Sequence, residues 1–271
     1  MRKHWPEAPS DVDPADAIRL QGELARRIDC TNRLRDVRFV AGVDISFPRG
    51  EVLSPQAQSH TIGRPGRRSL TPATPEARKK TDPHRSQLPE IARAAAVLLR
   101  YDDLRVVEIR IAQAPVRFPY IPGLLSFREA EAALAALRQL SITPDVVVVD
   151  GHGRAHPRRL GIASHLGLLS GLPTIGCAKS RLTGRALDPD DIRGSWTPLI
   201  ANGEVIGAVV RTKPRTKPVY VSIGNQVDLP KAIEVVLACD RGYRLPEPTR
   251  QAHLAAARGV EFIGHDEVSS T

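Results

Sequence analysis

Three acidic side chains stand out because each lies where a charge is costly or structurally constrained. Asp44 interrupts an apolar run, Asp150 follows four consecutive valines, and Glu129 follows a proline-bracketed loop. A carboxylate beside an apolar run is unfavourable unless it finds a hydrogen bond, a charge partner or a metal ion. Carboxylates from separate elements suit Mg²⁺ or Mn²⁺, which prefer oxygen ligands and leave room for a phosphate. Two such ions could activate a water and stabilise the leaving oxygen of a phosphodiester.

Basic and histidine side chains lie where they could assist such a site. Lys179 follows the apolar run 174–178 and would offset phosphate charge at the sheet edge near Asp150, although an ordinary strand-end lysine fits equally well. His156 could orient a water or a phosphate, or cap a turn. His165, beside a leucine within a helix, is expected in the core, and His253 on the last helix is expected at the surface. Position alone leaves the roles of Lys179 and His156 open.

Glu129 has a second interpretation. Ser126 and Glu129 have the spacing of a capping box, in which the serine caps a helix and the glutamate reaches back to the first backbone amide. The same carboxylate oxygens cannot serve fully as cap and as metal ligand. Spacing alone slightly favours the capping role.

The pattern of apolar residues predicts the elements that carry these side chains. An unbroken apolar run such as 146–149 is typical of a parallel strand buried on both faces, whereas the successive strands 38–47, 94–100 and 104–112 favour an antiparallel meander. Strands and helices then alternate, which indicates a parallel portion. We therefore expect an α/β fold: a mixed sheet, with an antiparallel three-strand meander plus parallel strands, flanked by helices. Helices are expected at 14–32, 126–140, 157–170, 229–240 and 248–258, and further strands at 173–178, 205–211 and 218–224.

The chain reads as a single domain over residues 14–258, with a loose arm at 1–13 and a frayed tail at 259–271. Residues 52–91 interrupt it, because they hold six prolines and seven Lys/Arg against three acids and show no apolar period. Such a segment is typical of a disordered or loosely held insertion. It could tether the protein to phosphates, but a tolerated surface loop is the favoured interpretation.

Composition limits the class of partner. The chain has 271 residues and a formal net charge of +9, which favours a polyanion such as nucleic acid. Cys30, Cys177 and Cys239 are odd in number and widely spaced, so we expect buried, reduced thiols and no metal knuckle. The sequence lacks the apolar stretch of a signal peptide or a bilayer span. We expect a cytoplasmic, soluble monomer that does not bind membranes.

Three segments of this sequence resemble signature motifs of the endonuclease V family, whose members are deoxyinosine 3′ endonucleases. They are Phe118–Glu129 (FPYIPGLLSFRE), Val149–Gly161 (VDGHGRAHPRRLG) and Tyr243–Arg250 (YRLPEPTR). The resemblance extends from about residue 15 to 258 apart from the insertion. Relatives join the first two strands by a short turn, but the insertion leaves the motifs intact, so we do not expect it to abolish activity.

The resemblance implies a ribonuclease H-like fold and assigns roles to individual residues. It implies that Asp44, Glu129 and Asp150 are catalytic metal ligands, which replaces the capping interpretation of Glu129. The position of His253 is Asp or His among relatives and belongs to the metal site; an imidazole is a softer ligand than a carboxylate. His156 and Lys179 match catalytic positions near the scissile phosphate. The implied cofactor is Mg²⁺, with Mn²⁺ as a possible substitute ion.

The resemblance also implies how a lesion would be recognised. Tyr120 and its neighbours would form a wedge that fills the gap left by a displaced base, and bracketing prolines would stiffen that wedge. The extruded base would enter a pocket, and extrusion is less costly at a damaged base pair. The wedge comprises Pro119, Tyr120, Ile121 and Pro122, and the base pocket comprises Gly123, Leu125, Gly151, Ile162 and Leu182.

The expected activity is hydrolysis of the second phosphodiester bond 3′ to deoxyinosine in DNA, leaving 3′-hydroxyl and 5′-phosphate ends. Two alternatives stay open. One is a preference for inosine in RNA or in single strands, which matched RNA and DNA substrates would decide, since the 2′-hydroxyl is the discriminating group. The other is a lesion-binding protein that does not cut, although the intact acidic set counts against it.

Overall fold

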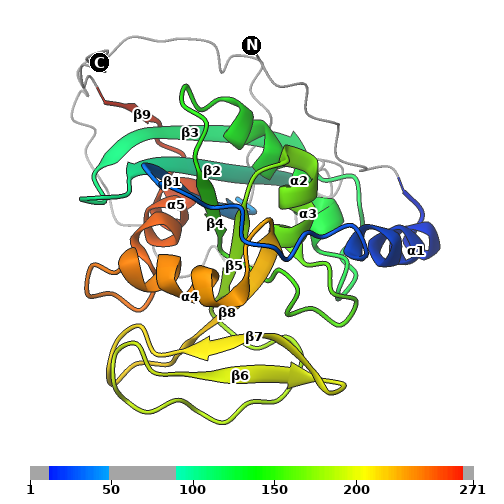
Figure 1. Ribbon diagram of the computed structural model, residues 1–271. Helices are drawn as coiled ribbons and strands as arrows, with labels where there is room; N and C mark the ends of the chain where they lie inside the picture. The colour runs from blue at the N-terminus through cyan, green and yellow to red at the C-terminus, as the bar shows by residue number, and fades with distance from the viewer. Residues whose placement is uncertain (1–11, 49–89, 265–271) are drawn as a thin grey trace, which may run out of the picture.

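The structure, a computed structural model, describes residues 12–48 and 90–264 (Figure 1). Within these residues a single sheet has the strand order β6-β7-β8-β5-β4-β1-β2-β3-β9. Its strands are β1 (Phe39–Ser46), β2 (Ile91–Arg100), β3 (Val106–Pro115), β4 (Val146–Val149), β5 (Thr174–Ala178), β6 (Trp196–Ala201), β7 (Glu204–Val210), β8 (Val219–Asn225) and β9 (Phe262–Ile263). The helices are α1 (Pro14–Ala25), α2 (Ser126–Arg138), α3 (Ile162–Ser170), α4 (Leu229–Ala238) and α5 (Glu247–Arg258).

The sheet combines the two kinds of pairing that the sequence predicts. β1, β2 and β3 form an antiparallel meander, whereas β1, β4 and β5 are parallel. The prediction of a mixed α/β sheet flanked by helices is therefore confirmed. Because β1, β4 and β5 run in the same direction, their carboxyl ends meet at one edge of the sheet. This shared edge positions Asp44 near the end of β1, Asp150 after β4 and Lys179 after β5.

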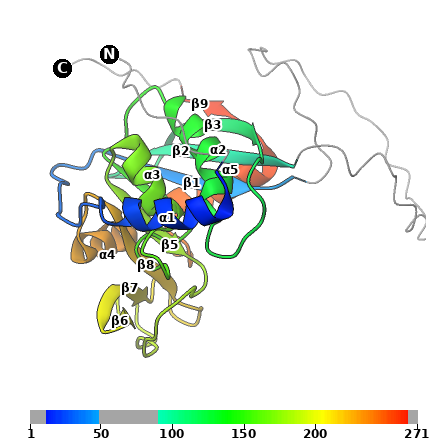
Figure 2. The same cartoon turned by 90° about the vertical axis from the view of Figure 1, so that its right-hand side faces the viewer.

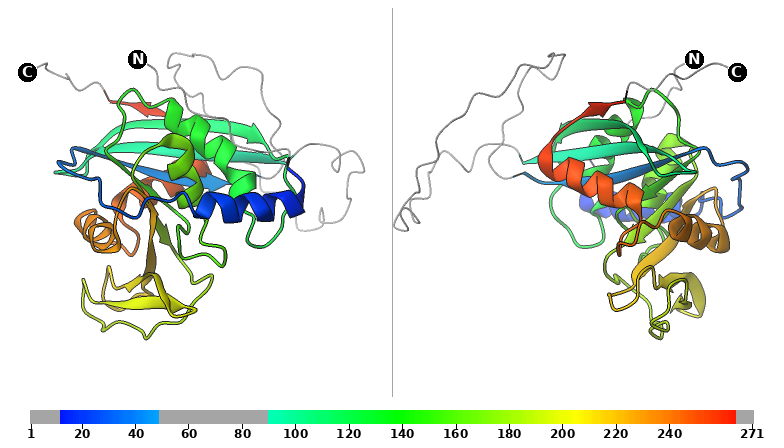
Figure 3. Two further views of the ribbon diagram at one scale, coloured as in Figure 1. Left: turned by 45° about the vertical axis from the view of Figure 1, so that its right-hand side comes forward. Right: turned by 90° about the vertical axis from the view of Figure 1, so that its left-hand side faces the viewer.

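Helices cover both faces of the sheet, as the two views in Figure 3 show. Val147 and Val149 pack in the cluster that includes α2 and α3, whereas Val146 and Val148 pack in the cluster that includes α4 and α5. All four valines are fully buried. Alternate side chains of a strand point to opposite faces of the sheet. Because both faces of β4 are covered by an apolar layer, every position of the strand must be apolar.

Two helices are shorter than the sequence predicts by more than one turn. The predicted helix 14–32 ends at Ala25. The residues that follow form turns in which Asp29 and Asn32 side chains accept hydrogen bonds from backbone amides two residues later, a pattern that competes with the helix. The predicted helix 157–170 begins only at Ile162, because Arg159 has a φ of 62° and breaks a helical path. The segment between β4 and α3 is therefore an irregular loop that can line a site.

The predicted boundaries at the chain ends and at the insertion need three corrections. Phe262 and Ile263 pair with β3, so the predicted frayed tail 259–271 contains a short strand. Asp13, expected in the loose arm 1–13, caps α1 by accepting a hydrogen bond from the backbone. Ile91 begins β2, and the remainder of the predicted insertion 52–91, apart from Glu90, lies outside the described residues.

The cysteines are free, and two of them have the burial that was predicted. Cys177 and Cys239 are buried, whereas Cys30 is half-buried. In the part of the chain that the structure describes, no helix combines the length and apolar character needed to cross a membrane.

Candidate active site

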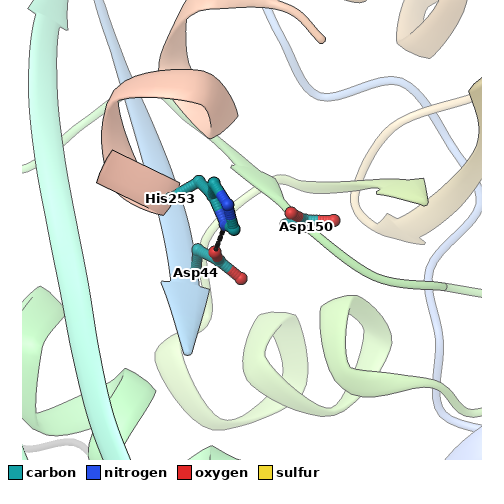
Figure 4. A group of neighbouring side chains, drawn as sticks. All are labelled: Asp44, Asp150 and His253. Atoms are coloured by element: carbon teal, nitrogen blue, oxygen red, sulfur yellow. Dashed lines mark hydrogen bonds and ion pairs between the residues drawn. The ribbon is translucent and has the colours of Figure 1, made fainter. Parts of the chain in front are cut away.

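Asp44, Asp150 and His253 converge from three separate elements (Figure 4). One ligand atom from each lies within 4.8 Å of the others. Asp44 comes from β1, Asp150 follows β4, and His253 projects from α5 on the face of the sheet that α5 covers. Two carboxylate oxygens and an imidazole nitrogen at this spacing form a donor set that fits a divalent cation.

Asp44 is the most constrained member of this group. It is buried, its Oδ2 lies 2.7 Å from Nδ1 of His253, and its Oδ1 accepts a 2.9 Å hydrogen bond from the backbone of Ile45. Burial, and then the charge of Asp150, raise the pKa of the Asp44 carboxyl. Positive charge placed between the two aspartates would reverse this electrostatic cost.

Lys179 supplies one positive charge at the site. Its Nζ lies 2.5 Å from Oδ2 of Asp150 and 3.4 Å from Nδ1 of His253. The Lys179 side chain is 38% exposed, so it can also reach outward to a ligand. The structure thus places this lysine beside the acidic group, as its position after β5 predicts.

Glu129 lies in the first turn of α2 and lines the same cleft as Asp44 and Asp150. Burial, and then the charge of Asp44, raise the pKa of Glu129 to about 8. Its carboxyl is therefore largely neutral at pH 7 unless a cation lies nearby. Glu129 is outside the 4.8 Å group, so it would join a metal site through water or after a rotamer change.

The capping box expected from spacing is wrong. The residue that precedes α2 is Leu125, and no side chain caps the helix. Ser126 already lies inside the helix, and its buried hydroxyl oxygen has no hydrogen-bond partner among the described residues. Glu129 is thus not held by a reciprocal cap, which leaves its carboxyl available to the cleft.

One cleft contains nearly all the predicted site residues. It is lined by Asp44, Glu129, Asp150, His156 and Lys179 from the catalytic set, by Tyr120, Ile121 and Pro122 from the wedge, and by Gly123, Leu125, Gly151, Ile162 and Leu182 from the base pocket. Pro119 and His253 are not part of its lining. The structure therefore brings together residues that are spread over most of the described chain.

Tyr120 has the exposure that a surface contact requires. It is 72% exposed at the rim of the cleft, and the Arg128 guanidinium lies 5.9 Å from its ring centroid. Arg128 also donates a 2.8 Å hydrogen bond to the carbonyl of Phe118 and pairs with Glu90. Arg128 thereby anchors the loop that carries the Tyr120 ring.

Two histidines that line the cleft, His152 and His156, are neutral at pH 7. Burial, and then the charge of Arg158, lower the pKa of His156 to about 4, and burial lowers that of His152 to about 4. Nδ1 of His156 accepts a 3.2 Å hydrogen bond from the Arg158 backbone, which leaves the other ring nitrogen as the N–H donor. His165 is fully buried, as predicted.

Sequence reasoning missed polar residues that lie at or behind the cleft, His152 and Gln21 among them. His152 lines it, and Nδ1 of His152 has no hydrogen-bond partner among the described residues. Gln21 is completely buried behind the cleft. His152 lies within a motif noted above and could have been found there, whereas the glutamine gave no signal beyond its position on the apolar side of a helix.

Comparison with known proteins places these features in a family. The sequence model of the family described as Endonuclease V matches residues 82–254. A relative named Endonuclease V from Trichormus variabilis is 56% identical over 243 residues, covering 89% of this chain and 93% of its own. The crystal structure of endonuclease V from Streptomyces avermitilis matches with a TM-score of 0.73 and 36% identity, covering 94% of each chain.

A further solved structure contains nucleic acid. It is endonuclease V from Ciona intestinalis in complex with a 24mer DNA containing an inosine followed by a ribo-adenosine. The match has a TM-score of 0.66 and 25% identity, and it covers 90% of this chain and 96% of that one.

Proposed function

The chain belongs to the endonuclease V family, and on that premise we propose that it is a metal-dependent endonuclease that cuts DNA at deoxyinosine. The proposed bond is the second phosphodiester 3′ to the lesion, and the products are 3′-hydroxyl and 5′-phosphate ends. The observation that carries the proposal is the convergence of Asp44, Asp150 and His253 within 4.8 Å, beside a cleft rimmed by Tyr120. The DNA bound to the Ciona relative supports DNA as the partner.

Asp44, Asp150 and His253 would hold the metal, with Glu129 beside them, and Mg²⁺ fits their mainly carboxylate character. When bound, the ion supplies positive charge that offsets the phosphate and makes water a better nucleophile. That same charge would keep Glu129 ionised, although burial raises its pKa to about 8. Glu129 could then accept a proton or a hydrogen bond at the cleft wall.

Lys179 and His156 have different roles in this proposal. The Lys179 ammonium pairs with Asp150 and would turn toward the scissile phosphate when DNA fills the cleft. Burial keeps His156 neutral at pH 7, so its N–H can orient a phosphate oxygen or a water without adding charge. Both side chains line the cleft.

Lesion recognition would use the other half of the cleft. Tyr120 is exposed and anchored through its loop, so it can occupy the gap left by a displaced base, with Pro119, Ile121 and Pro122 stiffening the wedge. The displaced base would enter the pocket beside Gly123, Gly151 and Ile162, with Leu125 and Leu182 at the pocket rim. Gly123 has a φ of +82°, so its backbone follows a path that favours glycine.

The test is cleavage of a duplex with one deoxyinosine, with and without Mg²⁺, followed by mapping of both product ends. We expect one nick at the second 3′ phosphodiester. Asp44→Asn and Asp150→Asn should lower the rate by at least about 100-fold while the duplex still binds. Asp102→Asn, at an exposed turn residue, is the matched control and should cut normally. A wild-type protein that leaves the duplex intact in Mg²⁺ and in Mn²⁺ would refute the proposal.

A second candidate is a preference for ribonucleotides at the cut. One observation favours testing it: the DNA bound to the Ciona relative carries a ribo-adenosine after the inosine. Matched substrates with deoxyinosine–deoxyadenosine, deoxyinosine–riboadenosine and all-RNA inosine separate the cases. The first two differ only in one 2′-hydroxyl, and the third carries it at every position. Faster cutting of the ribose substrates would establish this preference, and tight binding without any cutting would instead establish a lesion-binding protein.

A further inference from the structure

Gln21 is buried where an apolar side chain would be expected. Among the residues of α1, only Ala17 and Gln21 are fully buried, and they lie four positions apart on the same face of the helix. Figure 2 shows α1 on the same side of the sheet as α2 and α3. Ala17 packs with Phe118, Leu124 and Phe127, which flank the loop of Tyr120. Burying an amide costs free energy unless its hydrogen bonds are satisfied, so its partners matter.

The Gln21 amide joins two separate walls of the cleft. Nε2 donates to the carbonyl of Gly123 at 3.0 Å and to the carbonyl of Leu160 at 2.8 Å. Both carbonyls belong to residues that line the cleft: one lies in the loop before α2, and the other lies in the loop between β4 and α3. A single side-chain nitrogen therefore fixes the separation of two loops that are distant in sequence.

Arg158 completes this network. Its Nε donates to Oε1 of Gln21, and its Nη2 donates to the Gly123 carbonyl at 2.8 Å. A Cβ on Gly123 would lie 2.9 Å from that Nη2, so the glycine carbonyl and the guanidinium are in tight contact. The backbone N–H of Arg158 also donates a hydrogen bond to Nδ1 of His156. The orientation of His156 is thus linked to the same amide.

We infer that Gln21 is a positioning residue for base recognition: its amide ties Gly123 to Leu160 and so sets the width of the pocket that receives the displaced base. This inference rests on the proposed function. It concerns a residue that touches neither the metal site nor the reacting phosphate. Loss of the Gln21 hydrogen bonds should weaken binding of a duplex that places a base in the pocket. It should not weaken binding of a duplex that has no base at that position.

The test compares binding of two duplexes that differ only at the lesion, one with deoxyinosine and one with a tetrahydrofuran abasic site. Gln21→Met keeps the side-chain length and volume but removes all three hydrogen bonds. We expect it to weaken binding of the deoxyinosine duplex about tenfold and to change binding of the abasic duplex less than about twofold. Gln139→Met, at an exposed glutamine beyond α2, is the control and should bind both duplexes as the wild type does.

Gln21→Glu separates the tie between the walls from the contact with Arg158. A carboxylate still accepts from Arg158 but cannot donate to the Gly123 and Leu160 carbonyls. It should therefore lose deoxyinosine binding at least as strongly as Gln21→Met, and it provides a second reading if the methionine variant does not fold. Thermal unfolding checks that each variant is folded.

The outcomes distinguish this inference from the function on which it rests. If the wild type does not bind or cut the deoxyinosine duplex, the proposed function fails. If the wild type is active and a folded variant keeps the wild-type ratio of deoxyinosine to abasic binding, the positioning role is overturned. Equal loss on both duplexes is one case of this outcome, because a purely structural defect does not depend on the presence of a base.

Discussion

Nδ1 of His253 lies 2.7 Å from Oδ2 of Asp44, although 209 residues separate them in the chain. The contact exists because α5 lies directly against β1. Gly42 is two residues before Asp44 on the same face of that strand, and a Cβ at this position would overlap the carbonyl of Pro248 in the first turn of α5. The missing side chain of Gly42 thus permits the close packing that brings the imidazole to the aspartate.

Gly42→Ala should therefore damage both stability and the metal site. The added methyl group meets backbone atoms, which cannot turn aside, so we expect a loss of about 1–3 kcal/mol in the free energy of unfolding. Urea denaturation measures this, and cleavage at limiting Mg²⁺ should fall with it. Gly22→Ala is the control, because nothing lies within 4 Å of a Cβ at that helical position. An unchanged or raised stability is expected there. Equal behaviour of the two variants would contradict this account of the α5–β1 contact.

His253 itself should affect metal affinity more than stability. Its side chain is 52% exposed, so His253→Ala should leave the free energy of unfolding within about 0.5 kcal/mol of the wild type. The Mg²⁺ concentration for half-maximal cleavage should rise by about tenfold. His253→Asp supplies an oxygen ligand in place of the imidazole nitrogen and should recover part of that loss. The proposed ligand role fails if His253→Ala shows the wild-type Mg²⁺ dependence.

Tyr120 should contribute to DNA binding without contributing to stability. Because Tyr120 is 72% exposed, Tyr120→Ala should unfold at the wild-type urea concentration. Its affinity for the deoxyinosine duplex should fall by about 1–3 kcal/mol, the usual contribution of an aromatic ring stacked on a base. Tyr120→Phe keeps the ring and should bind normally. Fluorescence anisotropy measures both; wild-type affinity of the alanine variant would remove the wedge from the proposal.

The strand ends could be predicted from the sequence because they depend on local patterns. Four valines in a row indicate a strand with two buried faces, and the carboxylate of Asp150 follows directly. Parallel pairing then brings Asp44 and Lys179 to the same edge. The mixed sheet follows from the same patterns. The proposed metal-binding role of His253 came instead from family resemblance, because a histidine on an amphipathic helix is ordinarily a surface residue.

The features that sequence reasoning missed depend on contacts between distant segments. Gln21 is part of an ordinary helical pattern, and its partner Leu160 lies 139 residues away. The capping box failed for a local reason: α2 begins at Ser126, so the serine is too far inside the helix to cap it. The strand at Phe262 is two residues long and depends on the free edge of β3, which no local pattern reveals.

The core histidine His165 should make stability depend on pH. Burial lowers the pKa of His165 to about 4, compared with 6.5 for the free side chain, and neither ring nitrogen has a hydrogen-bond partner among the described residues. Between pH 4 and pH 6.5, His165 therefore binds a proton in the unfolded chain but not in the folded protein. The stability associated with neutral His165 is therefore fully present above pH 6.5 and is lost as the pH falls toward 4. The loss should reach about 3 kcal/mol at pH 4.

Urea denaturation at pH 7.5, 5.5 and 4 measures this dependence, with His165→Leu as the comparison. The leucine cannot bind a proton, so this variant should lose less stability on acidification than the wild type, by up to about 3 kcal/mol at pH 4. Some dependence should persist in both proteins, because burial also lowers the pKa values of His152 and His156. Because the ring of His165 packs edge-on against Phe127 at a centroid distance of 5.2 Å, the comparison uses changes with pH and not absolute stability. Parallel pH curves for the two proteins would show that the buried ring is not the source of the acid sensitivity.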